Sequence, residues 1–355
     1  MRCPNLAELP PPATTKRGWT WTEESVRVPE MMPDGKPLPR ISIVTPSYHQ
    51  GKFLEETLRS VLLQGYPNLE YLVIDGGSTD NSVEIIRKYE AWLTYWVSER
   101  DQGQSDAINK GWRCCTGDII AWLNSDDCYA PNALGAVARA FAAHDFPAMV
   151  YGNEIVIDDQ GNQTKTLEYR ASPDQMLAKL LLPHQPTAFF NRSVLEMIGF
   201  LDPSLQYAMD QAFLLKLMAT RRPVYVPAAL AFNRIYPATK TGTGQVQWGQ
   251  EILRVRDDVL RHWEAYPLLH PIGQARVGSN FHRVASAHFY LGGAFQESLR
   301  QIVFACQANP SAMLSILSDV GVRWLVRRLV PMALYRRLST AWISTWSSLR
   351  QSRGT

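Results

Sequence analysis

Two adjacent aspartates, Asp126 and Asp127, are the residues whose spacing is hardest to explain by folding alone. Neighbouring carboxylates repel one another, and capping a helix requires only one of them. A hard divalent cation such as Mg²⁺ or Mn²⁺ relieves that repulsion, and it commonly binds through one or two carboxylates together with substrate phosphate oxygens. We therefore expect Asp126 and Asp127 to bind a divalent metal.

Three other polar clusters follow short apolar runs of the kind that form buried strands. With the acidic pair, the clusters are 45–48 (TPSY), 75–80 (DGGSTD), 99–104 (ERDQGQ) and 124–127 (NSDD). Because ligands of open α/β sheets bind beyond the carboxyl ends of the strands, the four clusters would line one ligand-binding edge. Ser78, Asp80 and Ser105 are better explained as helix caps, which is the commonest use of Ser and Asp at such junctions.

The elements that must position these clusters alternate between strand-like and helix-like runs. The expected strands are 41–45, 69–75, 95–98 and 118–123, and the expected helices are 53–64, 82–89, 105–113 and 131–141. Four strand–helix units in succession predict an α/β fold, with a mainly parallel sheet covered by helices on both faces. A further strand at 148–157, with a hairpin return through 158–162, begins a second half in which strict alternation is lost.

The segments on either side of this domain have different patterns. Residues 1–40 are rich in proline and predict an extended arm, which Trp19 and Trp21 would anchor. The α/β domain would occupy 41–244, and a helical region would follow over 245–355. Within that region, 285–310 has the spacing of a single tetratricopeptide-type helical hairpin, and one copy cannot form a solenoid.

The composition excludes several classes of function. The chain has 36 basic and 33 acidic residues and a net charge of +3, so we expect no nucleic acid partner. Its five cysteines lack the spacing of a disulfide framework or a zinc site, which favours a reducing compartment. The first sixteen residues lack the apolar core of a signal peptide and no run is long enough to span a membrane, so we expect a cytoplasmic protein. The chain has no Walker A sequence and no GxGxxG after a strand, so the sequence supports neither a P-loop nucleotidase nor a dinucleotide dehydrogenase.

The ordered set of motifs resembles the family 2 glycosyltransferases, which are inverting enzymes of the GT-A fold. The matching segments are ISIVTPSYHQGKFLEETLRSVLLQ, LEYLVIDGGSTDNS, ERDQGQSDAINKG and GDIIAWLNSDDCYAP. The resemblance implies transfer of a sugar from a nucleotide-diphosphate sugar, with a UDP-sugar favoured, to an acceptor hydroxyl of a glycan or lipid-linked molecule. It also implies a role in polysaccharide or glycan assembly. Residues 41–147 would bind the nucleotide sugar and 148–244 the acceptor.

The resemblance assigns the donor site residue by residue. Donor-side positions would be Thr45, Pro46 and Ser47 at the nucleoside, Asp75 at the base, and Asp101, Gly103 and Gln104 in the next loop. Asn124 occupies the first position of the family's DxD motif, where its amide contributes no charge. Asp126 and Asp127 would then carry the Mg²⁺ or Mn²⁺ ion.

Further along the chain the resemblance assigns a base and an acceptor loop. Asp210 matches the acidic residue that opens a helix and acts as general base, although it also suits an amino-terminal helix cap. His184 and Gln185 match an acceptor-side loop, although a lone histidine is more often structural.

Arg234 and Lys240 match the basic segment that closes on the donor diphosphate, and an ordinary surface loop is the competing interpretation. Tyr236 stands near a position where some relatives carry a histidine metal ligand.

Two alternative functions and one alternative location remain open. A nucleotidyltransferase would share the sheet and the metal, but it usually has a glycine- and arginine-rich loop where this chain has 46–50. A non-catalytic nucleotide-sugar-binding scaffold would explain Asn124. Residues 321–355 contain seven arginines, three tryptophans and no acidic residue. They predict either a buried helical pair or basic helices on an anionic membrane surface, which would place the protein on the inner face of the membrane.

Overall fold

The computed structural model describes residues 3–32, 35–237 and 239–312. The described chain divides into two compact units, one formed by residues up to 243 together with 262–271, and the other by 244–261 together with residues from 272 onward. The first unit contains the sheet, and the second is helical.

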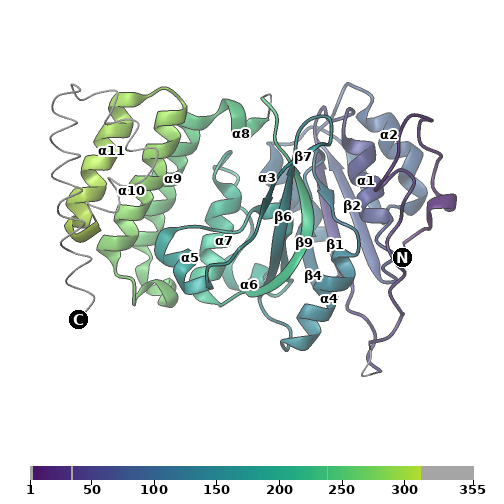
Figure 1. Cartoon of the computed structure of the whole chain (residues 1–355), viewed down its shortest axis with the longest axis horizontal. Helices are drawn as coiled ribbons and strands as arrows, with labels where there is room; N and C mark the ends of the chain where they lie inside the picture. Colours follow the sequence, from purple (N-terminus) through teal and green to yellow (C-terminus); the bar gives the residue numbers. More distant parts are fainter. Residues whose placement is uncertain (1–2, 33–34, 238, 313–355) are drawn as a thin grey trace. The chain divides into compact units, whose positions relative to one another are not determined.

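The sheet of the first unit has a parallel half built around its first strand (Figure 1). Strand β1 (Ile41–Ser47) pairs in parallel with β2 (Leu69–Asp75) and with β4 (Ile119–Trp122), and β2 pairs in parallel with β3 (Tyr95–Ser98). All seven residues of β1 and of β2 are buried, as expected of strands covered on both faces.

The second half of the sheet mixes parallel and antiparallel pairs. Its strands are β5 (Cys128–Tyr129), β6 (Met149–Ile157), β7 (Gln163–Leu167), β8 (Ala188–Asn191) and β9 (Val224–Arg234). The strand order is β3-β2-β1-β4-β8-β6-β9-β5, and β7 pairs with β6 as the expected hairpin. β6 and β9 are parallel, whereas β8 runs antiparallel to both β4 and β6.

Helices cover both faces of this sheet. They are α1 (Leu54–Leu62), α2 (Ser82–Tyr89), α3 (Gln104–Cys114), α4 (Ala133–Ala143), α5 (Pro173–Lys179), α6 (Val194–Ile198), α7 (Met209–Thr220) and α8 (Lys240–Thr243). Side chains of α1, α2 and α4 join alternate residues of β1, β2 and β4 in one apolar core. On the other face, Trp112 of α3 and Phe213 of α7 pack against each other and against Trp122 of β4. The expected α/β fold is confirmed.

The amino-terminal arm is attached to α1 and to the segment after β4. Trp19 Nε1 donates to the carbonyl of Tyr129 at 2.8 Å, and Trp21 is buried. Arg59 of α1 has no exposed surface, and its guanidinium donates to the carbonyls of Thr20 at 2.6 Å and Pro10 at 2.8 Å. The buried arginine therefore fixes the arm on the domain.

The second unit consists of α9 (Gln245–Arg261), α10 (Gln274–Leu291) and α11 (Phe295–Ala308). α10 packs against both α9 and α11, and the α10–α11 pair is the helical hairpin expected over 285–310. Ser279 Oγ donates to the carbonyl of Ala305 at 2.8 Å, which draws the two helices together. None of the helices in the described part of the chain is both long and apolar enough to cross a membrane.

Candidate active site at the strand ends

Asp75, the last residue of β2, organises the first turn of the site. The sheet register places it beside Ser47 of β1 and Ser98 of β3. Its Oδ2 accepts hydrogen bonds from the backbone of Gly77 at 3.1 Å and of Ser78 at 2.8 Å, and from Ser98 Oγ at 2.7 Å. Its Oδ1 accepts one from Ser78 Oγ at 2.6 Å. These four hydrogen bonds fix the carboxylate of Asp75, which has no exposed surface, and a contact between Asp75 and a nucleotide base stays a prediction.

Asp101 closes over the same turn. A Cβ atom at Gly76 would come within 2.7 Å of Asp101 Oδ2, so a larger residue there would displace the Asp101 carboxylate. Asp101 Oδ1 accepts from the backbone of Gly103 at 2.9 Å, and burial raises the pKa of Asp101. The turn after β2 and the loop before α3 are therefore adjacent, as the sequence motifs predicted for one sheet edge.

The predicted nucleoside residues lie inside the end of β1. Thr45 has no exposed surface, and its hydroxyl is 3.0 Å from that of Tyr71. Pro46 is also buried. The buried Ser47 Oγ has no hydrogen-bond partner among the described residues. Contact between these residues and a nucleoside stays a prediction.

The acidic turn after β4 contains two carboxylates in different environments. Asp127 is buried, and its Oδ1 accepts from the backbone of Arg234 at 2.8 Å while Oδ2 accepts from Asn124 Nδ2 at 3.2 Å. Asp126 is half-buried, and its Oδ2 accepts from Tyr236 at 3.3 Å. Burial raises the pKa of both carboxyls, and the charge of Asp126 raises that of Asp127 further. The two aspartates are thus adjacent in sequence but not equivalent.

A chain of polar contacts joins the acidic turn to the loops around it. Gln104 Nε2, at the start of α3, donates to Asn124 Oδ1 at 2.7 Å. Lys240 Nζ, at the start of α8, lies 3.4 Å from Gln104 Oε1. Since Asn124 also donates to Asp127, the donor-side loop, the acidic turn and the basic segment form one connected group. The structure brings together these residues, which the sequence assigned to a single site.

Arg234 lies behind the acidic turn, at the end of β9. Its side chain is 1% exposed. The guanidinium donates to the carbonyl of Asp126 at 2.9 Å, to the carbonyl of Asp158 at 3.0 Å and to the carboxylate of Glu56 at 2.8 Å. The guanidinium that the sequence assigned to a donor phosphate therefore already binds three protein acceptors. A phosphate contact by Arg234 stays a prediction.

Asp210 lies in the first turn of α7, whose N-cap residue is Ala208. Asp210 therefore does not serve as the N-cap, the structural role that the sequence also suggested for it. Burial raises the pKa of Asp210, and the nearby His184 and Lys240 oppose that rise without cancelling it. A carboxylate with a raised proton affinity suits the acceptance of a proton from a substrate hydroxyl.

His184 is oriented by a carboxylate that the sequence did not single out. Its Nδ1 is 3.0 Å from both oxygens of Glu154, which has no exposed surface, while half of the His184 side chain is exposed. Burial alone would lower the pKa of His184, but Glu154 outweighs it and raises the pKa. Glu154 is the one charged residue in the apolar run 148–157, and this position was the sequence signal that could have identified it.

Gln185, the neighbour of His184, is buried and holds the end of β4. Its Nε2 donates to the carbonyl of Trp122 at 2.6 Å. This contact fixes the short 3₁₀ helix Gln185–Thr187 beside the acidic turn. An acceptor contact by Gln185 stays a prediction.

Comparisons with known proteins agree with this arrangement. The family model described as glycosyl transferase family 2 matches residues 42–199. An uncharacterized glycosyltransferase of Mycobacterium tuberculosis is 30% identical over 197 residues, covering 54% of this chain and 74% of that protein.

Two solved structures share the fold. Residues 1–349 of S. aureus TarS in complex with UDP-GlcNAc have a TM-score of 0.61 at 16% identity, covering 86% of this chain and 92% of that one. Against a longer TarS structure, this chain spans 54% of that chain. The mannosyltransferase PcManGT from Pyrobaculum calidifontis, in complex with GDP-Man and Mn²⁺, has a TM-score of 0.53 at 20% identity, covering 88% of this chain and 87% of that one.

The strand order and the likeness to these two structures define a fold of the GT-A type. With a family model over 42–199 and a 30% identical relative of which it covers 74%, the chain belongs to glycosyl transferase family 2. The family resemblance stated from the motifs is confirmed.

Proposed function

We propose that this protein transfers a sugar from a nucleoside-diphosphate sugar to an acceptor hydroxyl with inversion, in the assembly of a glycan or polysaccharide. The observation that carries the proposal is the connected polar group formed by Lys240, Gln104, Asn124 and Asp127 at the strand ends. It provides hydrogen-bond donors and a cation beside two carboxylates, the combination that a metal-bound diphosphate requires. The relatives' complexes with UDP-GlcNAc and GDP-Man support a donor of this class.

The donor would lie across the ends of β1, β2 and β4. Asp75 would accept a hydrogen bond from the base of the donor, for which a UDP-sugar is favoured, and the unpartnered Ser47 Oγ lies beside it in the sheet register. Lys240 is the cation we assign to the diphosphate, because the guanidinium of Arg234 is already shared among three protein acceptors. Asp101, Gly103 and Gln104 would shape the donor-side wall.

The residues present fit a Mg²⁺ or Mn²⁺ ion held through few protein ligands. Among the described residues, no three His, Cys, Asp or Glu side chains form a ready-made metal cluster. A cation held mainly by diphosphate oxygens needs only one or two carboxylates. Asp126 suits the ligand role because it is half-buried and its Tyr236 contact is long, whereas Asp127 is held by Arg234 and Asn124. When bound, such a cation would neutralise charge developing on the leaving diphosphate.

Asp210 would be the general base. It would accept the proton of the acceptor hydroxyl while the hydroxyl oxygen bonds to the anomeric carbon and the bond from that carbon to the diphosphate oxygen breaks. Attack opposite the leaving group inverts the anomeric configuration. His184, held by Glu154, would lie on the acceptor side and favour the ionised form of Asp210.

The test is transfer by the purified protein with Mn²⁺ and a panel of UDP- and GDP-sugars, followed by mass spectrometry. Asp210→Asn should lower the transfer rate about 10²- to 10⁴-fold, because proton removal is lost, and leave donor binding unchanged. Asp202→Asn is the matched control, since Asp202 is exposed and its carboxylate accepts from the backbone of Ser204.

Two outcomes would count against the proposal. Near wild-type turnover of the Asp210→Asn variant would reject this residue as the base. Donor binding by the wild type with no transfer or hydrolysis across the panel would instead favour the non-catalytic scaffold.

A further inference from the structure

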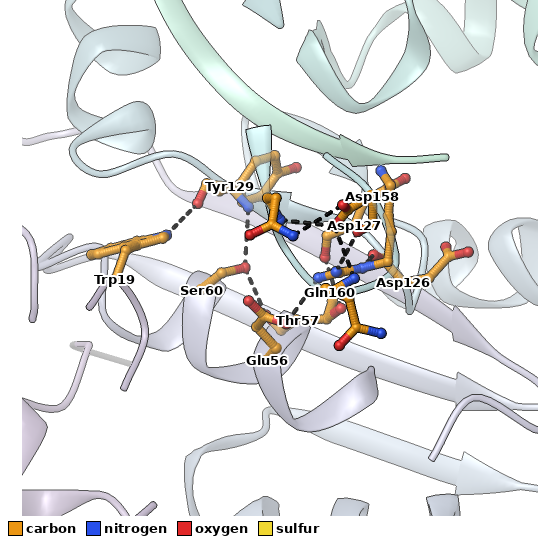
Figure 2. Close-up of polar contacts among 11 residues, drawn as sticks. Trp19, Glu56, Thr57, Ser60, Asp126, Asp127, Tyr129, Asp158 and Gln160 are labelled. Carbon is orange, nitrogen blue, oxygen red and sulfur yellow. Dashed lines mark hydrogen bonds and ion pairs between the residues drawn. The ribbon is translucent and has the colours of Figure 1, made fainter. Parts of the chain in front are cut away.

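One face of α1 is built against the acidic turn. Thr57 Oγ1 donates to the carbonyl of Asp127 at 2.7 Å, and Ser60 Oγ accepts from the backbone of Tyr129 at 3.1 Å. Glu56 and Thr57 are neighbours on this helix (Figure 2), and the Glu56 carboxylate lies 2.8 Å from the guanidinium of Arg234. Two hydroxyls of α1 therefore bind the backbone of this segment, and one carboxylate of α1 binds the Arg234 side chain behind it.

The carboxylate of Glu56 has a distinct electrostatic task. Arg234 is buried to 1% exposure, and two of its three acceptors are neutral carbonyls, of Asp126 and Asp158. A buried guanidinium requires a neutralising partner, and its removal leaves an uncompensated charge. Glu56, whose side chain is 24% exposed, supplies that negative charge from α1.

Arg234 also contacts both residues of the acidic turn, and Asp127 Oδ1 accepts from its backbone N–H at 2.8 Å. The other of these residues is Asp126, the proposed metal ligand. Arg234 Nε already donates to the carbonyl of this same residue. If Glu56 were neutral, the carboxylates of this turn would be left to balance the buried cation. Because Asp127 is already held by the backbone of Arg234 and by Asn124, the Asp126 carboxylate would be the one drawn toward the guanidinium.

We infer that Glu56 is a positioning residue for the divalent cation, because it neutralises Arg234 and so keeps the Asp126 carboxylate available to the metal. The inference rests on the proposed function, since it assumes that Asp126 binds Mg²⁺ or Mn²⁺. Glu56 itself touches neither the metal nor the donor. Its effect is transmitted through one buried guanidinium.

The experiment is calorimetric titration of MnCl₂ into the full chain in the presence of UDP, and separately of GDP. Glu56→Gln keeps the shape of the side chain and removes its charge. We expect the half-saturating Mn²⁺ concentration to rise about tenfold or more, the range found when partners of metal ligands are changed. A melting curve without Mn²⁺ for each variant separates this effect from general loss of stability.

Glu55→Gln is the matched control. Glu55 precedes Glu56 on α1, is similarly accessible at 27%, and forms an ion pair of 2.6 Å with Lys88 away from the acidic turn. The control loses an ion pair of comparable length without altering Arg234. We expect it to keep the wild-type Mn²⁺ requirement.

The outcomes separate the inference from the proposed function. Mn²⁺-dependent binding by the wild type, with Glu56→Gln matching Glu55→Gln, would overturn the inference alone. Absence of Mn²⁺-dependent nucleotide binding by the wild type would overturn both the inference and the proposed metal site, while sugar transfer is decided by the mass-spectrometric assay. Should Glu56→Gln show no cooperative melting, Glu56→Asp, which keeps the charge but withdraws it by one methylene, should need more Mn²⁺ than the wild type. A wild-type requirement in that variant would reject the inference.

Discussion

The imidazole of His184 is held by a buried carboxylate and interacts electrostatically with the proposed base. Glu154 has no exposed surface and holds Nδ1 at 3.0 Å, which favours the protonated imidazole. Asp210 has the opposite tendency, because burial favours its neutral form. A general base must be ionised to accept a proton, so the cationic His184 and Lys240 work in the direction that catalysis requires.

This arrangement predicts how the pH profile responds to His184→Gln. The raised pKa of Asp210 should make kcat/KM fall as pH decreases through a range above that of an ordinary aspartate. Removing the imidazolium removes an effect that lowers this pKa, so the pKa rises further and the acidic limb should move to higher pH. The measurement is kcat/KM against pH, with His144→Gln as control because His144 is exposed at the end of α4. A limb that stays in place or moves to lower pH would contradict the predicted coupling.

At the residue level, the sequence identified the groups that come together but not what fixes them. Gln104 and Asn124 were predicted to share one site because their clusters follow parallel strands, and they are in contact. Glu56 looked like an ordinary acidic residue of a first helical turn. Its importance depends on Arg234, which is 178 residues away along the chain. A pairing over that distance is decided by tertiary packing, which no local pattern reports.

At the scale of elements, α1 connects the arm and the acidic turn. Thr57 and Ser60 face the turn, while Arg59 on another side of the same helix donates to the arm carbonyls of Pro10 and Thr20. The arm in turn reaches the segment after the turn, because Trp19 donates to Tyr129 (Figure 2). The arm, whose role the sequence did not indicate, thus packs against the segment that follows the acidic turn.

Arg59→Met is expected to release the arm. The substitution leaves buried carbonyls without donors, so the free energy of unfolding should fall by about 3 kcal/mol in urea denaturation. Trypsin should cut faster after Lys16 and Arg17 in the arm, as followed by mass spectrometry. Arg87→Met on α2 is the control, because Arg87 is exposed. Unchanged stability and unchanged cleavage would show that the arm is held by other contacts.

The elements of the first half were predictable because their patterns are local. The bounds of β2, β3 and α2 agree with the expected 69–75, 95–98 and 82–89. β1 runs two residues further than the expected 41–45, through Pro46 and Ser47. The order of β8, β6 and β9 was not predictable, since these strands pair across long stretches of chain and in both directions.

At the scale of the whole molecule, the helical unit presents an apolar surface of its own. Phe295, Leu299 and Val303 recur every four residues on α11 and are 37%, 42% and 46% exposed. The predicted membrane-binding tail, 321–355, lies outside the described residues, so its membrane association stays a prediction. Two regions therefore suit a partner or a lipid surface: the apolar face of α11, which the structure describes, and the tail 321–355, which is predicted from the sequence.

Vesicle co-sedimentation tests the contribution of that tail. Each Lys or Arg near an anionic membrane contributes about 1 kcal/mol, so the seven arginines of 321–355 should direct the full chain to phosphatidylglycerol vesicles. Binding should weaken as salt screens the charges, and it should be small on phosphatidylcholine, which has no net charge. Neither condition changes the apolar residues, so a loss of binding in both would identify the charges as its cause. A version ending at Asp319 keeps every described residue and should remain in the supernatant. If that version co-sediments as strongly as the full chain, the basic tail is not the membrane-binding segment, and the apolar face of α11 becomes the region to alter next.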